Sequence, residues 1–530
     1  MKLKKIVWKI FVSGIWTQPI VYFVLVRMIR SINPNLIDIY EVKYICVAIS
    51  LLPFMFLFNV FMNEPREEAA ITGKEQAMRP PVNKKLLYRK PQGIFFGKHR
   101  SKYVCRDVNE DGHVLLIGGT GSGKSSRSVI NTILCNPTVT MFSIDIKGEL
   151  SFKATKYGSK KVRIFNPQDR DAYGYNPLYG LSDKSTGQEI YERMQLISFS
   201  LIAMPASLKD PFWKNSSRNL LIGMLVYYFK QGNHSFVEIV DQILSAPIKE
   251  QIEAILNNSR KTSVEYRYIV GFKDMEEETL GGIVGEMNNH LQIFANDQDI
   301  RYAFKDSAHK ISPKTLLKGK SIFISIREEK LTAYYDVLQM IINQMLAELE
   351  KRPEDSKPII FIIDELPRIL SAGKIDRLLD AARTLRSRKV TLFLITQSVE
   401  ALMIAFSESE AMDIISNCPY VIVLNASSSK TQKMICDWAG KYRARRKSWN
   451  FDGMETSRSR VSINYEEKNI LEPADLKKLG NDAILFSPYG YNRIKKCAYY
   501  SDKYFKPLSE ACVKHNKAIL EMRRECDCNG

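Results

Sequence analysis

The stretch that decides the fold is HVLLIGGTGSGKSS, residues 113–126. Its second part matches the pattern G-x-x-x-x-G-K-S and comprises Gly118, Gly119, Thr120, Gly121, Ser122, Gly123, Lys124, Ser125 and Ser126. An apolar run typical of a strand precedes this loop, and a helical pattern follows it. Glycines allow backbone N–H groups to curl around a phosphate, and the positive end of the following helix faces the same place. The sequence therefore predicts a phosphate-binding loop.

The loop has a candidate partner in PIIFIIDE, residues 358–365. In such a pair, Lys124 is expected to reach the β and γ phosphates, and Ser125 and Asp364 to hold Mg²⁺. Glu365 is then expected to polarise the attacking water. We therefore predict an ATPase that uses ATP and Mg²⁺. The alternative for the loop is a glycine-rich turn formed by chance. The alternative for residues 358–365 is an ordinary buried strand that ends in two exposed acids.

Further apolar runs alternate with helical patterns and predict strands at residues 138–145, 161–165, 321–326, 391–396 and 420–424. Continuous apolar strands with helical links are typical of an α/β fold, in which a mostly parallel sheet is covered on both faces. Gln397 follows one of these runs. It is expected either to sense the γ phosphate or to make only a strand-end hydrogen bond.

The long interval between the two nucleotide motifs contains apolar residues at spacings of three and four, which indicates helices. We therefore expect an inserted all-helical domain at 191–310, between two parts of a nucleotide-binding domain at 71–190 and 311–505. A short tail, 506–530, follows.

Two apolar stretches, about 6–26 and 44–62, open the chain. A helix of about 20 apolar residues is long enough to cross a bilayer, so residues 1–70 are expected to form a two-helix transmembrane anchor. The distribution of Lys and Arg around the stretches places both termini and the bulk of the chain in the cytoplasm.

Composition narrows the class of partner. The formal net charge is +19, which favours nucleic acid or anionic lipid as a partner, although a general solubility bias is the alternative. The nine cysteines lack the spacing of a zinc site or of a disulfide framework and fit a reducing compartment.

The chain resembles the coupling proteins of type IV secretion, of the TraG/TraD conjugation type. The resemblance runs from the apolar hairpin to about residue 505. It is carried by GGTGSGKSS (118–126), SIDIKGEL (143–150), YNPL (175–178), DPFWKNSSRNLLIGML (210–225), FIIDELPRI (361–369), LFLITQS (392–398) and ILEPADLKKLGNDAILFSPYG (470–490).

The resemblance implies a RecA-like ATPase that assembles as a homo-hexamer in the bacterial inner (cytoplasmic) membrane. Such a protein would link single-stranded DNA and its attached relaxase, or an effector protein, to the type IV secretion channel. The resemblance also implies an arginine that completes the site of a neighbouring subunit. Arg386 is the candidate and Arg388 the second choice, unless both lie on a solvated helix end.

A basic and aromatic run at 440–450 is a candidate DNA contact. Cations would meet phosphates and aromatic rings would stack on bases; the residues are Lys441, Arg443, Arg445, Arg446, Lys447 and Trp449. The alternative is a solvated loop.

There are three alternative functions for the whole chain. A nucleotide-dependent receptor or scaffold for protein effectors would use the same motifs. A chromosome-partitioning pump of the FtsK type would favour more membrane spans. An ABC transporter would carry an LSGGQ-like signature before residue 361, which this sequence lacks.

Overall fold

The computed structural model describes residues 19–34, 36, 39–62, 80–204, 210–370, 374–375, 377–450 and 460–528. By its internal contacts the chain divides into two units: residues 1–77 with 442–468, and residues 78–441 with 469–530. The second unit contains both nucleotide motifs. Each unit is described by itself.

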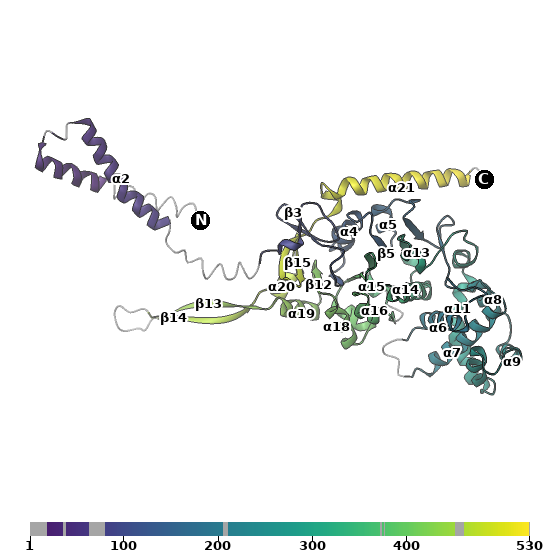
Figure 1. The fold of residues 1–530 in the computed structure, drawn as a ribbon. Coiled ribbons are helices and arrows are strands. Elements are labelled where there is room, and N and C mark those ends of the chain that lie inside the picture. The colour runs from purple at the N-terminus through teal and green to yellow at the C-terminus, as the bar shows by residue number, and fades with distance from the viewer. Residues whose placement is uncertain are drawn as a thin grey trace. The chain divides into compact units, whose positions relative to one another are not determined.

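In the described part of the second unit, twelve strands form one sheet in the order β1-β3-β2-β16-β15-β12-β4-β11-β10-β5-β9-β6 (Figure 1). Their bounds are β1 Leu87–Tyr88, β2 Ile94–His99, β3 Lys102–Arg106, β4 Val114–Ile117, β5 Thr140–Asp145, β6 Val162–Phe165, β9 Ser321–Ser325, β10 Ile359–Ile363, β11 Val390–Thr396, β12 Tyr420–Val423, β15 Asp482–Ser487 and β16 Gly490–Lys495. A small separate sheet pairs β7 Gly174–Tyr175 with β8 Lys310–Ile311.

The seven strands from β12 to β6 are parallel, whereas β15, β16, β2, β3 and β1 extend the sheet in antiparallel pairs. The fold is therefore α/β with a large mixed sheet. The five predicted strands all form. The sequence did not indicate the antiparallel extension, because its strands are short and only partly apolar.

The parallel strands are buried on both faces. Residues alternate strictly between two hydrophobic clusters: Phe361 and Ile363 belong to one, and Ile360 and Ile362 to the other. Side chains in a strand point to opposite faces in turn, so each cluster lies on one face of the sheet. Burial of each such side chain contributes about 1.5–3 kcal/mol.

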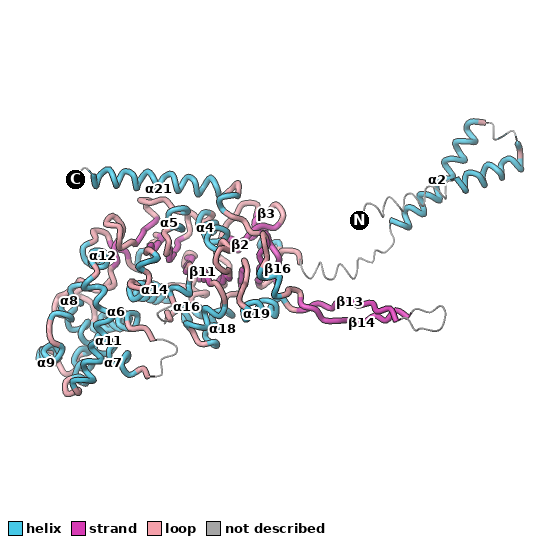
Figure 2. Tube along the Cα trace, turned by 180° about the vertical axis from the view of Figure 1, so that it is seen from behind, coloured by secondary structure: helices cyan, strands magenta, loops and turns pink. Residues whose placement is uncertain are grey.

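Helices cover both faces. The second cluster includes residues of α4 Ile130–Leu134, α5 Glu149–Ala154 and α21 Phe505–Cys528, and α21 lies beside α5 and α4 (Figure 2). The first includes residues of α14 Tyr335–Glu350, α16 Leu378–Thr384, α17 Val399–Ala405, α18 Glu408–Ser416, α19 Ser429–Ala439 and α20 Pro473–Lys477.

The described residues between β7 and β8 form helices without strands. These are α6 Gly187–Leu201, α7 Phe212–Lys230, α8 Phe236–Ser245, α9 Ile248–Asn258, α10 Val264–Ile269, α11 Glu277–Asn296 and α12 Gln298–Arg301. They gather at one end of the unit (Figure 1). Their own core is continuous with that of the sheet face. The predicted domain limits at 190 and 310 remain predictions.

In the other unit, residues 19–32 are helical and α2 spans Tyr40–Met62. Taken alone, the described residues include no helix with both the length and the apolar character needed to cross a membrane. The predicted spans at 6–26 and 44–62 lie partly outside the residues and side chains that the structure describes, so the anchor remains a prediction. This unit also contains most of the two-stranded sheet of β13 Lys441–Asn450 and β14 Arg460–Asn469.

Candidate nucleotide site

The phosphate-loop sequence connects the carboxyl end of β4 to a helix that begins at Ser125. Gly121 and Gly123 have φ values of +75° and +83°, which glycine adopts without a steric penalty. The Gly118 N–H donates to Thr396 O at 3.0 Å, and the Gly119 N–H donates to Asn425 Oδ1 at 2.6 Å. The loop is thus held from β11 on one side and from the end of β12 on the other.

The Lys124 side chain is buried and lies inside its own loop. Its ammonium donates to Gly118 O at 3.0 Å and lies 4.0 Å from Glu365 Oε1. Burial lowers the pKa of the Lys124 ammonium, while Glu365 and Asp364 oppose that effect. A buried cation within a glycine-rich loop favours an anionic ligand.

Ser125 and Asp364 join the two motifs. The Ser125 hydroxyl donates to Asp364 Oδ2 at 3.1 Å, which the parallel arrangement of β4, β11 and β10 makes possible. Asp364 Oδ1 is buried and, among the described residues, has no hydrogen-bond partner. Burial raises the pKa of Asp364 to about 6, and Glu365 and Asp145 add to the rise.

A cavity of about 100 Å³ opens beside this pair; it is lined by Ser125, Asp145, Ile146, Lys147, Glu149, Leu150, Asp364, Glu365 and Arg368. Hydroxyl and carboxylate oxygens are the ligands that Mg²⁺ prefers, and Mg²⁺ usually takes its other ligands from water and substrate phosphates. The described part of the chain contains no group of three His, Cys, Asp or Glu side chains that could hold a metal ion without other ligands. The unpaired oxygen of Asp364 and the hydroxyl of Ser125 therefore suit Mg²⁺ bound together with a nucleotide.

Glu365 occupies a strained backbone position. Its φ of +58° is left-handed, and it precedes the short helix α15 Leu366–Ile369. Such a conformation costs a non-glycine residue about 1–3 kcal/mol and is concentrated at functional sites. The carboxylate lies between the Lys124 ammonium and Arg368 Nε, which is 3.3 Å away.

Three residues of the site were not predicted from the sequence, although strand order or helix spacing indicates the position of each. Asp145 ends β5, which pairs with β10 so that Ile144 aligns with Ile363. Asn425 follows β12, whose Val423 aligns with Ile117 before the loop. Arg368 lies one helical turn after Glu365. Each position follows from strand order or helix spacing, and strand order was not predicted.

Gln397 follows the last residue of β11, between the strand of the loop and the strand of the acids. It is half-buried. The Thr396 carbonyl before it accepts the hydrogen bond of Gly118. The position is compatible with both roles expected from the sequence.

Arg386 and Arg388 lie in the turn before β11, at its amino end. The nucleotide loop lies at the carboxyl edge of the same parallel strands, and seven residues of strand span about 20 Å. Arg386 is exposed, and no side chain among the described residues pairs with it. It therefore lies away from the nucleotide site of its own chain.

The backbone of the basic run forms strand β13, and not the loop that was the alternative to a DNA contact. Of the candidate DNA contacts, the structure describes the side chain of Lys441 alone. Those of Arg443, Arg445, Arg446, Lys447 and Trp449 lie outside the described side chains. Their role stays a prediction.

A protein-family model described as "Type IV secretory system Conjugative DNA transfer" matches residues 68–522. The chain is 20% identical over 442 residues to protein VirD4 of Agrobacterium fabrum, a match that covers 80% of this chain and 65% of that protein. Protein VirD4 of Rhizobium rhizogenes is 20% identical over 440 residues, with 80% and 64% covered. The chain thus spans slightly less than two thirds of the length of these relatives.

Solved structures of the bacterial conjugative coupling protein TrwB share the fold. The unbound TrwBdeltaN70 form has a TM-score of 0.60 and 17% identity, and the match covers 77% of this chain and 90% of that one. TrwB in complex with ADP and Mg²⁺ has a TM-score of 0.61 and 17% identity, with 79% and 93% covered.

Proposed function

Because the chain belongs to the type IV secretory system conjugative DNA transfer family, we propose that it is a membrane-anchored ATPase. It couples ATP hydrolysis to the transfer of single-stranded DNA and attached relaxase, or of an effector protein, into a type IV secretion channel. The observation that carries the ATPase proposal is the Ser125–Asp364 hydrogen bond, since it joins the phosphate loop to the acidic strand in one cavity.

ATP would be held by the loop of residues 118–126, through backbone amides beyond Gly119 and through Lys124. Its ammonium would exchange Gly118 O for a phosphate oxygen. Ser125 and Asp364 would hold Mg²⁺, which supplies positive charge against the charge that develops on the transferring phosphate. TrwB, which shares the fold, has been solved with an ATP analogue and with ADP and Mg²⁺.

Glu365 is the proposed base for the attacking water. Its side chain is partly exposed, and its carboxylate lies between the Lys124 ammonium and Arg368 Nε. Its oxygens can accept a hydrogen bond from the attacking water, which is the contact that a general base needs. Gln397 would orient the γ phosphate from the end of β11.

The proposed working assembly is a homo-hexamer. Arg386 lies at the opposite sheet edge from the site of its own chain, so it would complete the site of a neighbour. This arrangement requires a heterologous ring contact, in which one edge of each subunit meets the other edge of the next.

We place the protein in the bacterial inner membrane, with residues 6–26 and 44–62 as the anchor and both termini in the cytoplasm. The two apolar stretches support this location. Alkaline extraction of membranes tests it: the chain should stay in the membrane pellet, and release into the supernatant would contradict the anchor.

The ATPase proposal is tested by measuring phosphate release from ATP and Mg²⁺ with the full chain. Lys124→Ala should reduce the rate at least about 100-fold, because one preorganised charge on the transferring phosphate is lost. Lys184→Ala, which removes an exposed lysine elsewhere, should change it little. Equal rates for Lys124→Ala and the wild type would refute the site.

A further inference from the structure

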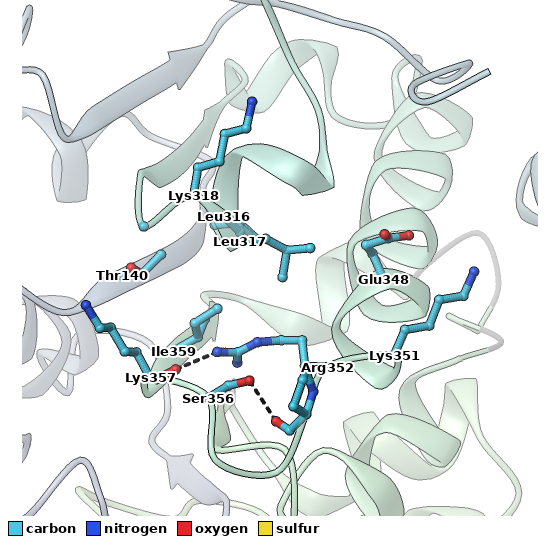
Figure 3. Close-up of a pocket in the computed structure, with 12 residues that line it drawn as sticks. Thr140, Leu316, Leu317, Lys318, Glu348, Lys351, Arg352, Ser356, Lys357 and Ile359 are labelled. Atoms are coloured by element: carbon cyan, nitrogen blue, oxygen red, sulfur yellow. Dashed lines mark hydrogen bonds between the residues drawn. The ribbon is translucent and has the colours of Figure 1, made fainter. Parts of the chain in front are cut away.

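A second cavity lies at the amino ends of the parallel strands (Figure 3). Its volume is about 550 Å³, and its walls include Thr140 at the start of β5 and Ile359 at the start of β10. Further walls come from α13 Pro313–Leu317 and the end of α14. The nucleotide loop follows the carboxyl end of β4, so the two cavities lie at opposite edges of the sheet. A volume of this size accommodates a small molecule.

Cations from three separate segments line this cavity: Lys318 after α13, Lys351 and Arg352 after α14, and Lys357 before β10. Among the described residues that line the cavity, one is acidic, namely Glu348. Its carboxylate accepts a hydrogen bond from the Tyr179 hydroxyl at 3.3 Å. No described carboxylate lies within ion-pair distance of the four cations. Glu354 and Asp355 are exposed on the adjoining turn and do not line the cavity.

Arg352 is the most informative of these cations because only 7% of it is exposed. Its Nη1 donates to Arg388 O at 3.2 Å and its Nη2 to Lys357 O at 2.5 Å. Figure 3 shows the guanidinium pointing toward the Lys357 carbonyl. These two carbonyls accept hydrogen bonds from the guanidinium but provide no counter-charge, and burial lowers the pKa of Arg352. A buried charge in this condition is stabilised by a bound anion.

The cavity also offers an apolar surface. Leu317 is 44% exposed and Leu316 is buried beside it. The combination of point charges from three segments with an apolar wall suits a ligand that carries more than one negative charge and a small non-polar part. A monocarboxylate would leave most of the positive charge uncompensated.

We propose that this cavity binds a small phosphorylated ligand. The exposed side chains of Lys318, Lys351 and Lys357 point outward in Figure 3 and would turn toward its phosphate oxygens. The buried Arg352 supplies further positive charge from the cavity wall, and the rest of the ligand packs against Leu316 and Leu317. Arg352 also holds the carbonyl of Arg388, so the ligand lies beside the turn that carries Arg386. The binding site itself does not depend on the proposed ATPase function.

Isothermal titration calorimetry with inorganic pyrophosphate, on the full chain in EDTA, tests the proposal by stoichiometry. The wild type should bind two pyrophosphates per chain, one in the nucleotide loop and one in this cavity. Lys351→Ala/Lys357→Ala should retain one, with the cavity site weakened at least about tenfold for each lysine removed. Lys124→Ala should also retain one, namely the cavity site.

The matched control is Lys261→Ala/Lys273→Ala, which removes the same charge from exposed lysines of the helical region; it should retain two sites. One site in the wild type together with none in Lys124→Ala would overturn the proposal, as would two sites in Lys351→Ala/Lys357→Ala. Two sites in Lys124→Ala would instead refute the nucleotide-loop assignment. If the double variant loses its thermal unfolding transition, the single variants Lys351→Gln and Lys357→Gln give the same test.

Discussion

At the scale of single residues, the site holds a carboxylate where ionisation is costly. Asp364 is buried, one of its oxygens has no partner among the described residues, and its pKa is raised to about 6 from 3.8. Each pKa unit corresponds to about 1.4 kcal/mol. The nucleotide-free protein therefore carries a penalty that a bound cation would remove.

Asp364→Asn should accordingly make the nucleotide-free protein more stable while abolishing Mg²⁺-dependent hydrolysis. The native carboxyl binds more protons than the unfolded one between pH 3.8 and about 6, so the stability of the wild type falls as pH rises through that window. The variant should exceed the wild type by about 1–3 kcal/mol at pH 8, and by about 1 kcal/mol less at pH 5. Urea unfolding in EDTA measures this, with Asp355→Asn as the exposed control; a variant less stable than the wild type at pH 8 would contradict the account.

Glu365 is predicted to act in hydrolysis and not in binding. Glu365→Gln removes the base but retains the size of the side chain, so hydrolysis should slow about 10²–10⁴-fold. ATP should still bind, which a fluorescent ATP analogue would report. Full-rate hydrolysis by this variant would exclude Glu365 as the base; Glu354→Gln, on an exposed turn, is the control.

At the scale of elements, a buried histidine connects the start of β4 to β11 and α16 by hydrogen bonds. His113, before β4, accepts a hydrogen bond from the Leu392 N–H at 3.1 Å and donates to Ala382 O of α16 at 3.0 Å. These roles fix a neutral ring, and burial lowers the pKa of His113 to about 4. The turn with Arg386 and Arg388 lies between the two elements that this ring connects.

His113→Phe should destabilise the protein by about 2–4 kcal/mol at pH 8, because a buried N–H and a buried carbonyl lose their partners. In the wild type, the stability provided by the neutral ring is complete above pH 6.5 and is lost as pH falls toward 4. The variant should lack this loss, of which about 2 kcal/mol is already present at pH 5. Urea unfolding between pH 5 and pH 8 measures both effects; unchanged stability at pH 8 would remove the assigned role of His113.

The sequence predicted the parallel strands and the nucleotide loop because long apolar runs and glycine spacing are local signals. In the folded chain the Ser125 hydroxyl donates to Asp364, and the Lys124 ammonium lies 4.0 Å from Glu365. The antiparallel strands were missed because they are short and only partly apolar. The roles of Asp145 and Asn425 were missed because they depend on which strands pair, and pairing is decided by packing over the whole sheet. The cavity at the amino edge was missed for the same reason, since its three cationic segments meet only in the folded sheet.

At the scale of the whole molecule, the position of Arg386 predicts complementation between inactive variants. Lys124→Ala and Arg386→Ala should each lose hydrolysis when measured alone. In rings mixed at random, about a quarter of the sites would pair an intact loop with an intact arginine. Mixing should therefore restore measurable activity. Repeating the experiment with Arg388→Ala in place of Arg386→Ala shows which arginine is responsible. No recovery with either arginine variant would contradict a shared site.

The most direct test of the central claim is the ATP hydrolysis rate of the full chain with and without single-stranded DNA, at low and at high salt. A DNA-coupled motor predicts a rate that rises with DNA and a stimulation that fades with salt, because phosphate contacts release counterions. Glu365→Gln should show no stimulation. Unchanged wild-type hydrolysis at both salt concentrations would contradict DNA coupling and favour a nucleotide-dependent receptor for protein cargo.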